Sequence, residues 1–134
     1  MPPKTITGRC LCGAVRYEYS GVLADPSWCH CESCRRASGA PAVAWVTMQL
    51  VQFRFTHGAP HQYASSMKVV RTFCAGCGSP LTYRHEDFAD SIDVTAATLD
   101  DPAVAKPLEH IWMSEAIVWD QPNDGLPQHA KTPA

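Results

Sequence analysis

The chain has 134 residues, a formal net charge of −2 and 46% hydrophobic residues, a composition typical of a globular protein rather than a disordered one. We expect one domain over residues 1–134, with its core at about 5–127. Lysines and arginines are dispersed and no apolar run is long enough to span a bilayer, which argues against a nucleic-acid or membrane partner. The first residues contain no apolar segment typical of a secretory signal, so the expected compartment is the reducing cytoplasm.

Short strands dominate the predicted elements, and no segment has a sustained helical period. Residues 5–19 read as strand, turn, strand, because Val15, Tyr17 and Tyr19 alternate with polar residues. A loop follows over 21–26, and then one or two helical turns over 32–38 that Gly39 ends. Further strands are expected at 42–48, 51–56, 61–65, 68–73, 81–85 and 91–95. Asp101 should cap a short helical turn, the run 109–119 has a mixed period, and the chain from 120 onward should lie over the surface. The sequence thus predicts a mainly β domain of one or two small sheets.

Seven cysteines are present, and an odd number in a reducing compartment favours metal ligation over disulfides. Two pairs share one design, because each follows a strand and has glycine directly after its second cysteine, at Gly13 and Gly78. Two such knuckles complete a tetrahedron of four sulfurs and join distant parts of a small domain. We therefore predict a structural zinc on Cys10, Cys12, Cys74 and Cys77.

The other three cysteines, Cys29, Cys31 and Cys34, lie on one short segment and have no matching knuckle. Together they supply three ligands for a second zinc, which normally takes four. Either the fourth position is open for chemistry, or a histidine closes the site. The His30 side chain should point away from a metal held by both flanking cysteines. The sequence leaves four histidines open as ligands: His57, His61, His85 and His110.

Three thiolates make zinc a weak Lewis acid for activating water, but they still allow it to bind a fourth thiol and lower the pKa of that thiol. The open site therefore predicts attack by a substrate thiol on a small electrophile, or the reverse cleavage of a carbon–sulfur bond. Arg35 is the candidate for binding a carboxylate of that substrate. Arg36 is a second candidate, and Glu32 is an alternative partner for either arginine. Trp28 and Trp45 are more simply core residues, and Asp93, Glu115 and Asp124 receive no role.

The cysteine pattern resembles one known family. The ordered set consists of Gly8-x-Cys10-x-Cys12-Gly13, Cys29-His30-Cys31-x2-Cys34-Arg35, Ser38-Gly39-Ala40 and Phe73-Cys74-x2-Cys77-Gly78. Weaker matches follow at Leu99-Asp100-x-Pro102, His110-Ile111-Trp112 and Asp124-Gly125-Leu126-Pro127. From about Thr7 to Pro127, the chain is similar to the glutathione-dependent formaldehyde-activating enzyme (GFA) family.

This resemblance implies a β-tent fold of mainly antiparallel strands. It implies two zinc ions, a structural one on the four paired cysteines and a catalytic one on Cys29, Cys31 and Cys34. The implied activity is that of a carbon–sulfur lyase, which condenses formaldehyde with a small-molecule thiol, glutathione, to give S-(hydroxymethyl)glutathione. An exposed β edge and the tryptophans near the C-terminus add a homodimer as a further expectation.

Two other classes of function compete with a lyase. In the first, the protein is a non-catalytic zinc-binding module in which both zinc ions are structural. In the second, the three-cysteine segment is a redox or metal-responsive switch that loses its zinc reversibly on oxidation.

Overall fold

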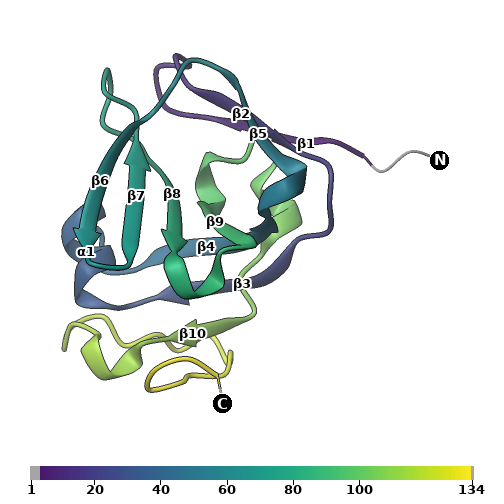
Figure 1. The fold of residues 1–134 in the computed structure, drawn as a ribbon. Helices are drawn as coiled ribbons and strands as arrows, with labels where there is room; N and C mark the ends of the chain where they lie inside the picture. Colours follow the sequence, from purple (N-terminus) through teal and green to yellow (C-terminus); the bar gives the residue numbers. More distant parts are fainter. Residues whose placement is uncertain (1–3, 134) are drawn as a thin grey trace.

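A computed structural model describes residues 4–133 (Figure 1). One α-helix, α1, spans Glu32–Ser38. Ten strands are present in the described part of the chain: β1 (Ile6–Arg9), β2 (Arg16–Tyr19), β3 (Ala24–Cys29), β4 (Val43–Gln49), β5 (Phe53–His57), β6 (His61–Ser66), β7 (Val69–Phe73), β8 (Pro80–His85), β9 (Ser91–Thr95) and β10 (Glu109–Ile111). Single 3₁₀ turns lie at Leu50–Gln52, Glu86–Phe88, Ala96–Thr98, Pro102–Ala105 and Met113–Glu115. The predicted mainly β fold is confirmed.

The strands form two sheets. The smaller has the order β1-β2-β5, and the larger has the order β10-β3-β4-β9-β8-β7-β6. Neighbouring strands are antiparallel everywhere except between β10 and β3, which run parallel. In Figure 1 the small sheet lies above one end of the large sheet, so the chain encloses its core between them.

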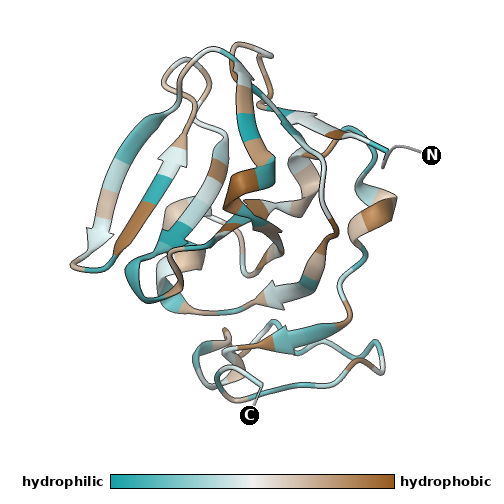
Figure 2. Cartoon of the chain, turned by 45° about the vertical axis from the view of Figure 1, so that its right-hand side comes forward, coloured by the Kyte–Doolittle hydropathy of each residue, from teal (hydrophilic) through white to brown (hydrophobic). Residues whose placement is uncertain are grey.

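The core follows from the alternation seen in the sequence. Val15, Tyr17 and Tyr19 are buried on one face of the β2 region, and they pack against Met48 and Val94 of the large sheet. Removing apolar surface from water in this way is the main stabilising contribution to the fold. Figure 2 shows apolar residues concentrated on the strands of the main body, whereas the last part of the chain is mostly pale or hydrophilic.

One local prediction needs correction. Residues 21–26 are not a loop throughout, because β3 already begins at Ala24, and a bulge between Ala24 and Ser27 hides its alternation. The short turn predicted after Asp101 is present at Pro102–Ala105, with Asp101 at the N-cap position, although the Asp101 side chain makes no capping hydrogen bond. The run 109–119, which has a mixed period, contains the short strand β10 and one turn.

Residues 106–133, which we call the C-terminal segment, lie along the edge of the large sheet beside β3 (Figure 1). Main-chain hydrogen bonds hold this segment to itself: His110 N donates to Pro127 O and His129 N donates to His110 O, at 2.8 and 2.9 Å. His30 N donates to Ile111 O at 3.0 Å and joins it to the main body. The segment therefore reaches the end of β3, where the three-cysteine stretch begins.

Candidate metal centres and active site

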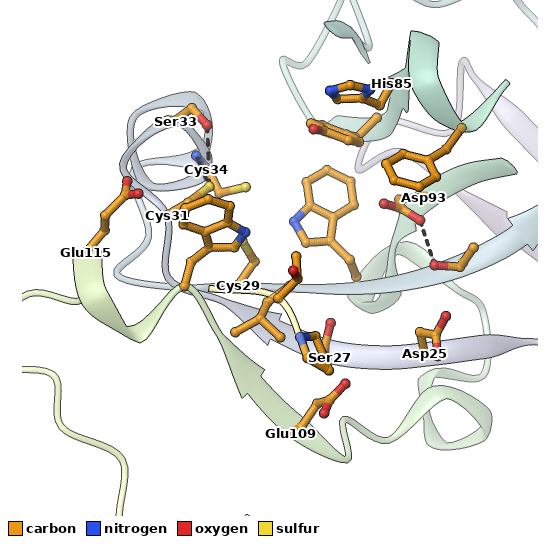
Figure 3. Close-up of a pocket in the computed structure, with 18 residues that line it drawn as sticks. Asp25, Ser27, Cys29, Cys31, Ser33, Cys34, His85, Asp93, Glu109 and Glu115 are labelled. Carbon is orange, nitrogen blue, oxygen red and sulfur yellow. Dashed lines mark hydrogen bonds between the residues drawn. The ribbon is translucent and has the colours of Figure 1, made fainter. Parts of the chain in front are cut away.

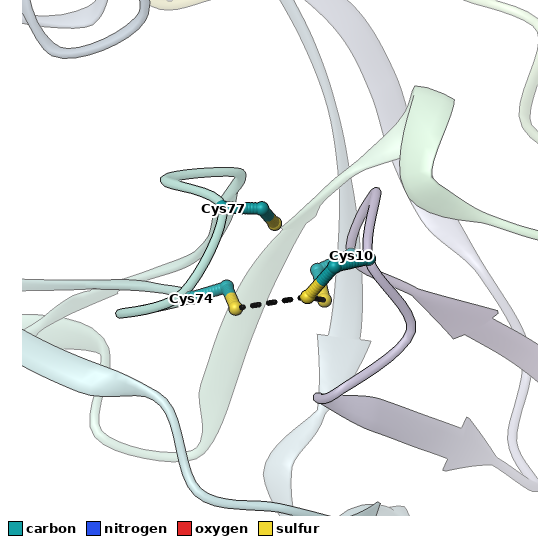
Figure 4. A group of neighbouring side chains, drawn as sticks. Cys10, Cys74 and Cys77 are labelled. Carbon is teal, nitrogen blue, oxygen red and sulfur yellow. Dashed lines mark hydrogen bonds between the residues drawn. The ribbon is translucent and has the colours of Figure 1, made fainter.

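The two knuckles bring four cysteines together. Cys10 and Cys12 lie in the β1–β2 turn, Cys74 and Cys77 lie in the β7–β8 turn, and all four Sγ atoms are within 4.8 Å of one another. Figure 4 shows the two turns meeting with their sulfurs directed at one point. The glycine after each pair has a φ of +79°, a left-handed conformation that favours glycine.

The donor set of this cluster fits zinc. Cys10 Sγ lies 3.6 Å from Cys12 Sγ, and Cys12 Sγ lies 3.7 Å from Cys74 Sγ. Four sulfurs at about 2.3 Å from a tetrahedral zinc ion lie about 3.8 Å apart. Hydrogen bonds from the Ser79 hydroxyl and backbone lower the pKa of Cys77 to about 5, which favours a thiolate ligand. These four residues therefore suit a closed metal centre.

The second cluster is built from a strand end and a helix start. Cys29 ends β3, Cys31 is the N-cap of α1, and Cys34 is buried in the first turn of that helix. Cys31 Sγ accepts the Cys34 N–H at 3.4 Å, as an N-cap side chain does, so the two sulfurs face each other. Gly39 ends the helix with a φ of +74°, as predicted. All three Sγ atoms lie within 4.8 Å of one another.

Three thiols this close cannot ionise independently. Hydrogen bonds from Cys29 and Cys34 lower the pKa of Cys31 to about 2, whereas the contact with Cys31 raises the pKa of Cys29. The cluster by itself thus favours one negative charge shared among three sulfurs. A bound cation would allow all three to be thiolates, so this cluster also fits a metal.

No histidine joins this cluster within residues 4–133. The predicted orientation of His30 is confirmed: its ring is buried, and Nε2 lies 2.9 Å from Nδ1 of His110. His110 Nε2 lies 2.8 Å from a carboxylate oxygen of Asp124, and His30 Nδ1 lies 3.5 Å from that of Asp120. This histidine pair fastens the C-terminal segment behind the three cysteines.

Arg71 on β7 is a partner that sequence reasoning missed. It is buried, and its Nη2 donates to Ser33 Oγ at 3.1 Å and to Cys34 Sγ at 3.7 Å. The guanidinium lies over the ring of Tyr83, 5.0 Å from its centroid. A positive charge beside Cys34 favours its thiolate and offsets the negative charge of three sulfurs. No motif marks this arginine, because sheet pairing alone brings it to the site.

A cavity of about 600 Å³ opens over the three cysteines, all of which line it (Figure 3). One face of the large sheet and the C-terminal segment form its walls. The aromatic side chains among the lining residues are Trp45, Tyr83, His85, Phe88 and Trp112. None of the four knuckle cysteines lines this cavity. Cys29, Cys31 and Cys34 thus face a space that admits a small molecule.

The two arginines after the cluster lie elsewhere. Arg35 does not line the cavity, and its Nε is buried without a hydrogen-bond partner among the described residues. Arg36 pairs with Glu32 one helical turn away, at 3.0 Å, which is the alternative that the sequence left open. Substrate binding by Arg35 stays a prediction.

A sequence model described as "Glutathione-dependent formaldehyde-activating enzyme" matches residues 5–115 of this chain. The chain belongs to the GFA family. All seven cysteines fall within the matched range. The cavity nevertheless includes Thr132 and Pro133, so part of its wall lies beyond the family match.

Two further comparisons give proteins similar to this chain. An uncharacterized lyase of Schizosaccharomyces pombe is 32% identical over 80 residues, which are 58% of this chain and 56% of that protein. The match therefore spans about half the length of that relative. A crystal structure of a Rhodobacter sphaeroides protein superimposes with a TM-score of 0.62 and 25% identity, covering 92% of this chain and 98% of that chain. Within residues 4–133, no helix is both long and apolar enough to cross a membrane.

Proposed function

We propose that this protein is a zinc-dependent carbon–sulfur lyase of the GFA type, with two zinc ions per chain. It joins a small-molecule thiol such as glutathione to formaldehyde or a related small electrophile, as an S-(hydroxymethyl)glutathione synthase does. One observation carries the proposal: all three sulfurs of the smaller cluster line a cavity of about 600 Å³, and none of the four knuckle cysteines lines it. A metal centre with a vacant position is where chemistry takes place.

The two clusters divide the work. Cys10, Cys12, Cys74 and Cys77 hold a structural ion, and Cys29, Cys31 and Cys34 hold the catalytic one. Zinc in the three-sulfur site supplies a position that keeps a substrate thiol as a thiolate near neutral pH. Arg71 supports the negative charge of this group from behind, at Cys34.

The bond changes need no oxidant. The sulfur lone pair forms the new bond to the carbonyl carbon, the carbon–oxygen π bond breaks, and the oxygen takes up the proton that the thiol gave up. Tyr83 lines the cavity, and burial raises the pKa of its hydroxyl, so it keeps a proton to donate toward the developing alkoxide. The indoles of Trp45 and Trp112 reduce the access of water to the reacting carbon.

Cobalt substitution tests this function directly. An uncharged thiol, mercaptoethanol, is titrated into the protein loaded with Co²⁺, and the sulfur-to-metal charge-transfer band is followed. We expect the band to grow in the wild type and in a Cys74→Ser variant that retains its fold, but not in Cys31→Ser. Formaldehyde consumption with thiol should fall to background in Cys31→Ser.

The alternative with two structural zinc ions makes the opposite prediction. If no added thiol changes the cobalt spectrum at saturation, both centres are closed and the lyase proposal is wrong.

A further inference from the structure

The cavity over the three cysteines is lined by four carboxylates and by no lysine or arginine. The carboxylates belong to Asp25, Asp93, Glu109 and Glu115. Figure 3 shows Glu115 beside the cysteines, Glu109 below them, and Asp25 with Asp93 at the other end of the cavity. His85 also lines this space, but its Nδ1 accepts the Asp87 N–H at 3.1 Å, as a neutral imidazole can.

None of these carboxylates has a lysine or arginine ion-pair partner in the described chain. Asp93 accepts from the Thr47 hydroxyl at 2.7 Å, and Glu115 accepts from the Glu32 N–H at 2.8 Å. Glu109 contacts His129 Nε2 at 2.9 Å. Burial raises the pKa of Asp93 more than the Thr47 hydrogen bond lowers it, and no lysine or arginine ion pair among the described residues compensates its charge. A ligand that brings a positive charge would supply this compensation.

The walls between the carboxylates are aromatic. Trp45 and Tyr83 lie with ring centroids 5.9 Å apart and ring planes 57° apart, and Trp112 and Phe88 line the same cavity. The Arg71 guanidinium already lies over the ring of Tyr83, 5.0 Å from its centroid. Aromatic faces combined with carboxylates are the chemistry that binds amines and quaternary ammonium groups.

The strand register gives the distance from the metal cluster to these charges. Along β4, Val43 pairs with Cys29, Trp45 pairs with Ser27, and Thr47 pairs with Ala24 beyond the bulge. Glu109 pairs with Ser27, and Asp93 pairs with Thr47. At about 3.3 Å per residue, the Glu109 level lies about 7 Å from Cys29, and the Asp93 level lies about 13 Å from it. The carboxylates thus form a series leading away from the sulfurs.

Backbone strain marks the same cavity. Among residues 4–133, the non-glycine residues with positive φ are Asp25, at 50°, and Trp112, at 57°. Both line the cavity. Such conformations cost free energy and concentrate where a side chain must be held in a functional position.

We propose that the thiol substrate carries a positively charged amine or ammonium group, about 7–13 Å from its sulfur, which binds among Asp93, Glu109 and the indoles of Trp45 and Trp112. This inference rests on the proposed function and narrows its thiol. Glutathione has two carboxylates against one amine, and this cavity disfavours that excess of negative charge. A cationic aminothiol matches both the charges and the aromatic walls.

Three thiols with the same six-carbon chain test the charge preference: aminohexanethiol, mercaptohexanol and mercaptohexanoate. Their dissociation constants are measured from the charge-transfer band of the cobalt-loaded protein. We expect aminohexanethiol to bind about tenfold tighter than the alcohol, and mercaptohexanoate to bind weakest. Asp93→Asn combined with Glu109→Gln should remove most of the amine preference, measured as the ratio of the dissociation constants for mercaptohexanol and aminohexanethiol. Asp101→Asn, which removes an exposed carboxylate outside the cavity, is the matched control.

The outcomes separate this inference from the function on which it rests. Equal binding of all three thiols overturns the cationic substrate but keeps the lyase, whereas a spectrum that no thiol changes removes both. An amine preference that survives the double substitution shows that these carboxylates do not bind the amine. Quenching of tryptophan fluorescence by choline, which has no thiol, gives a second measurement. The single variants Asp93→Asn and Glu109→Gln replace the double variant if that variant does not fold, and each should reduce the amine preference.

Discussion

Replacing Cys74 with serine removes one of the four sulfurs that join the β1–β2 turn to the β7–β8 turn. Cys12 and Cys74 are 62 residues apart in sequence, so a metal shared between them closes a long loop. The chain-entropy expression for a cross-link of that span gives about 4 kcal/mol. Cys31 and Cys34 are three residues apart, and the same expression gives about 2 kcal/mol for them.

Urea unfolding measures this difference when it is followed by tryptophan fluorescence, with zinc in excess or with zinc removed by a chelator. In zinc, we expect Cys74→Ser to lose up to about 4 kcal/mol of unfolding free energy, the full amount applying when Cys10, Cys12 and Cys77 alone no longer hold the ion, and Cys31→Ser to lose about 2 kcal/mol or less. A domain of this size has about 5–15 kcal/mol in total, so the first loss is large. In chelator, the wild type and the two variants should have the same unfolding free energy.

Two results would refute this reasoning. Equal losses for the two substitutions in zinc would mean that the span of the loop does not set the contribution of each centre. A loss at Cys74 that persists in chelator would mean that the cysteine stabilises the fold by packing alone.

Three other predictions concern the surroundings of the two clusters. The hydrogen bond from His110 holds the pKa of Asp124 below its ordinary 3.8. The stabilisation from this ionised carboxylate is therefore complete above about pH 4 and is lost as the pH falls through the lowered pKa. Asp124→Asn should lower the melting temperature of the protein near pH 7 and make that temperature decline less steeply in acid. Arg71→Met removes the positive charge beside Cys34, so zinc should leave the three-sulfur site at a higher pH, as a chromogenic chelator would report, whereas Asp101→Asn should not change this pH. Gly78→Ala has open space for its methyl group but a φ of +79°, so it should cost about 1–2 kcal/mol in urea unfolding, and an unchanged midpoint would contradict the strain argument.

Local sequence signals predicted the elements that carry the cysteines. Glycine after each cysteine pair marked the two matching knuckle turns, where Gly13 and Gly78 have positive φ, and Gly39 predicted the end of α1. These positions were readable because a single residue decides the backbone conformation. The sequence also indicated which cysteines lie together, because the two cysteine pairs share the same turn pattern.

The surroundings of the site depended on contacts that no local pattern encodes. Arg71 reaches Cys34 across 37 residues, through the order of strands in the large sheet. Asp93 and Glu115 received no role from the sequence, because only the strand register and the C-terminal segment bring them into one cavity. The parallel pairing of β10 with β3 was equally unreadable, since β10 has three residues and no clear period.

The attachment of the C-terminal segment has a consequence for how GFA proteins diversify. Main-chain hydrogen bonds give the segment its shape. Trp112 N donates to Lys131 O at 2.9 Å, and Met113 N donates to His129 O at 3.0 Å. Such bonds tolerate most changes of side chain. The segment supplies Glu109, Trp112 and Glu115 to the cavity but no cysteine to either cluster. Evolution can therefore exchange the substrate-facing wall while the metal-binding scaffold stays intact. Relatives with all seven cysteines should differ most at the positions of this segment that face the cavity, and an alignment in which those positions vary least would contradict this expectation.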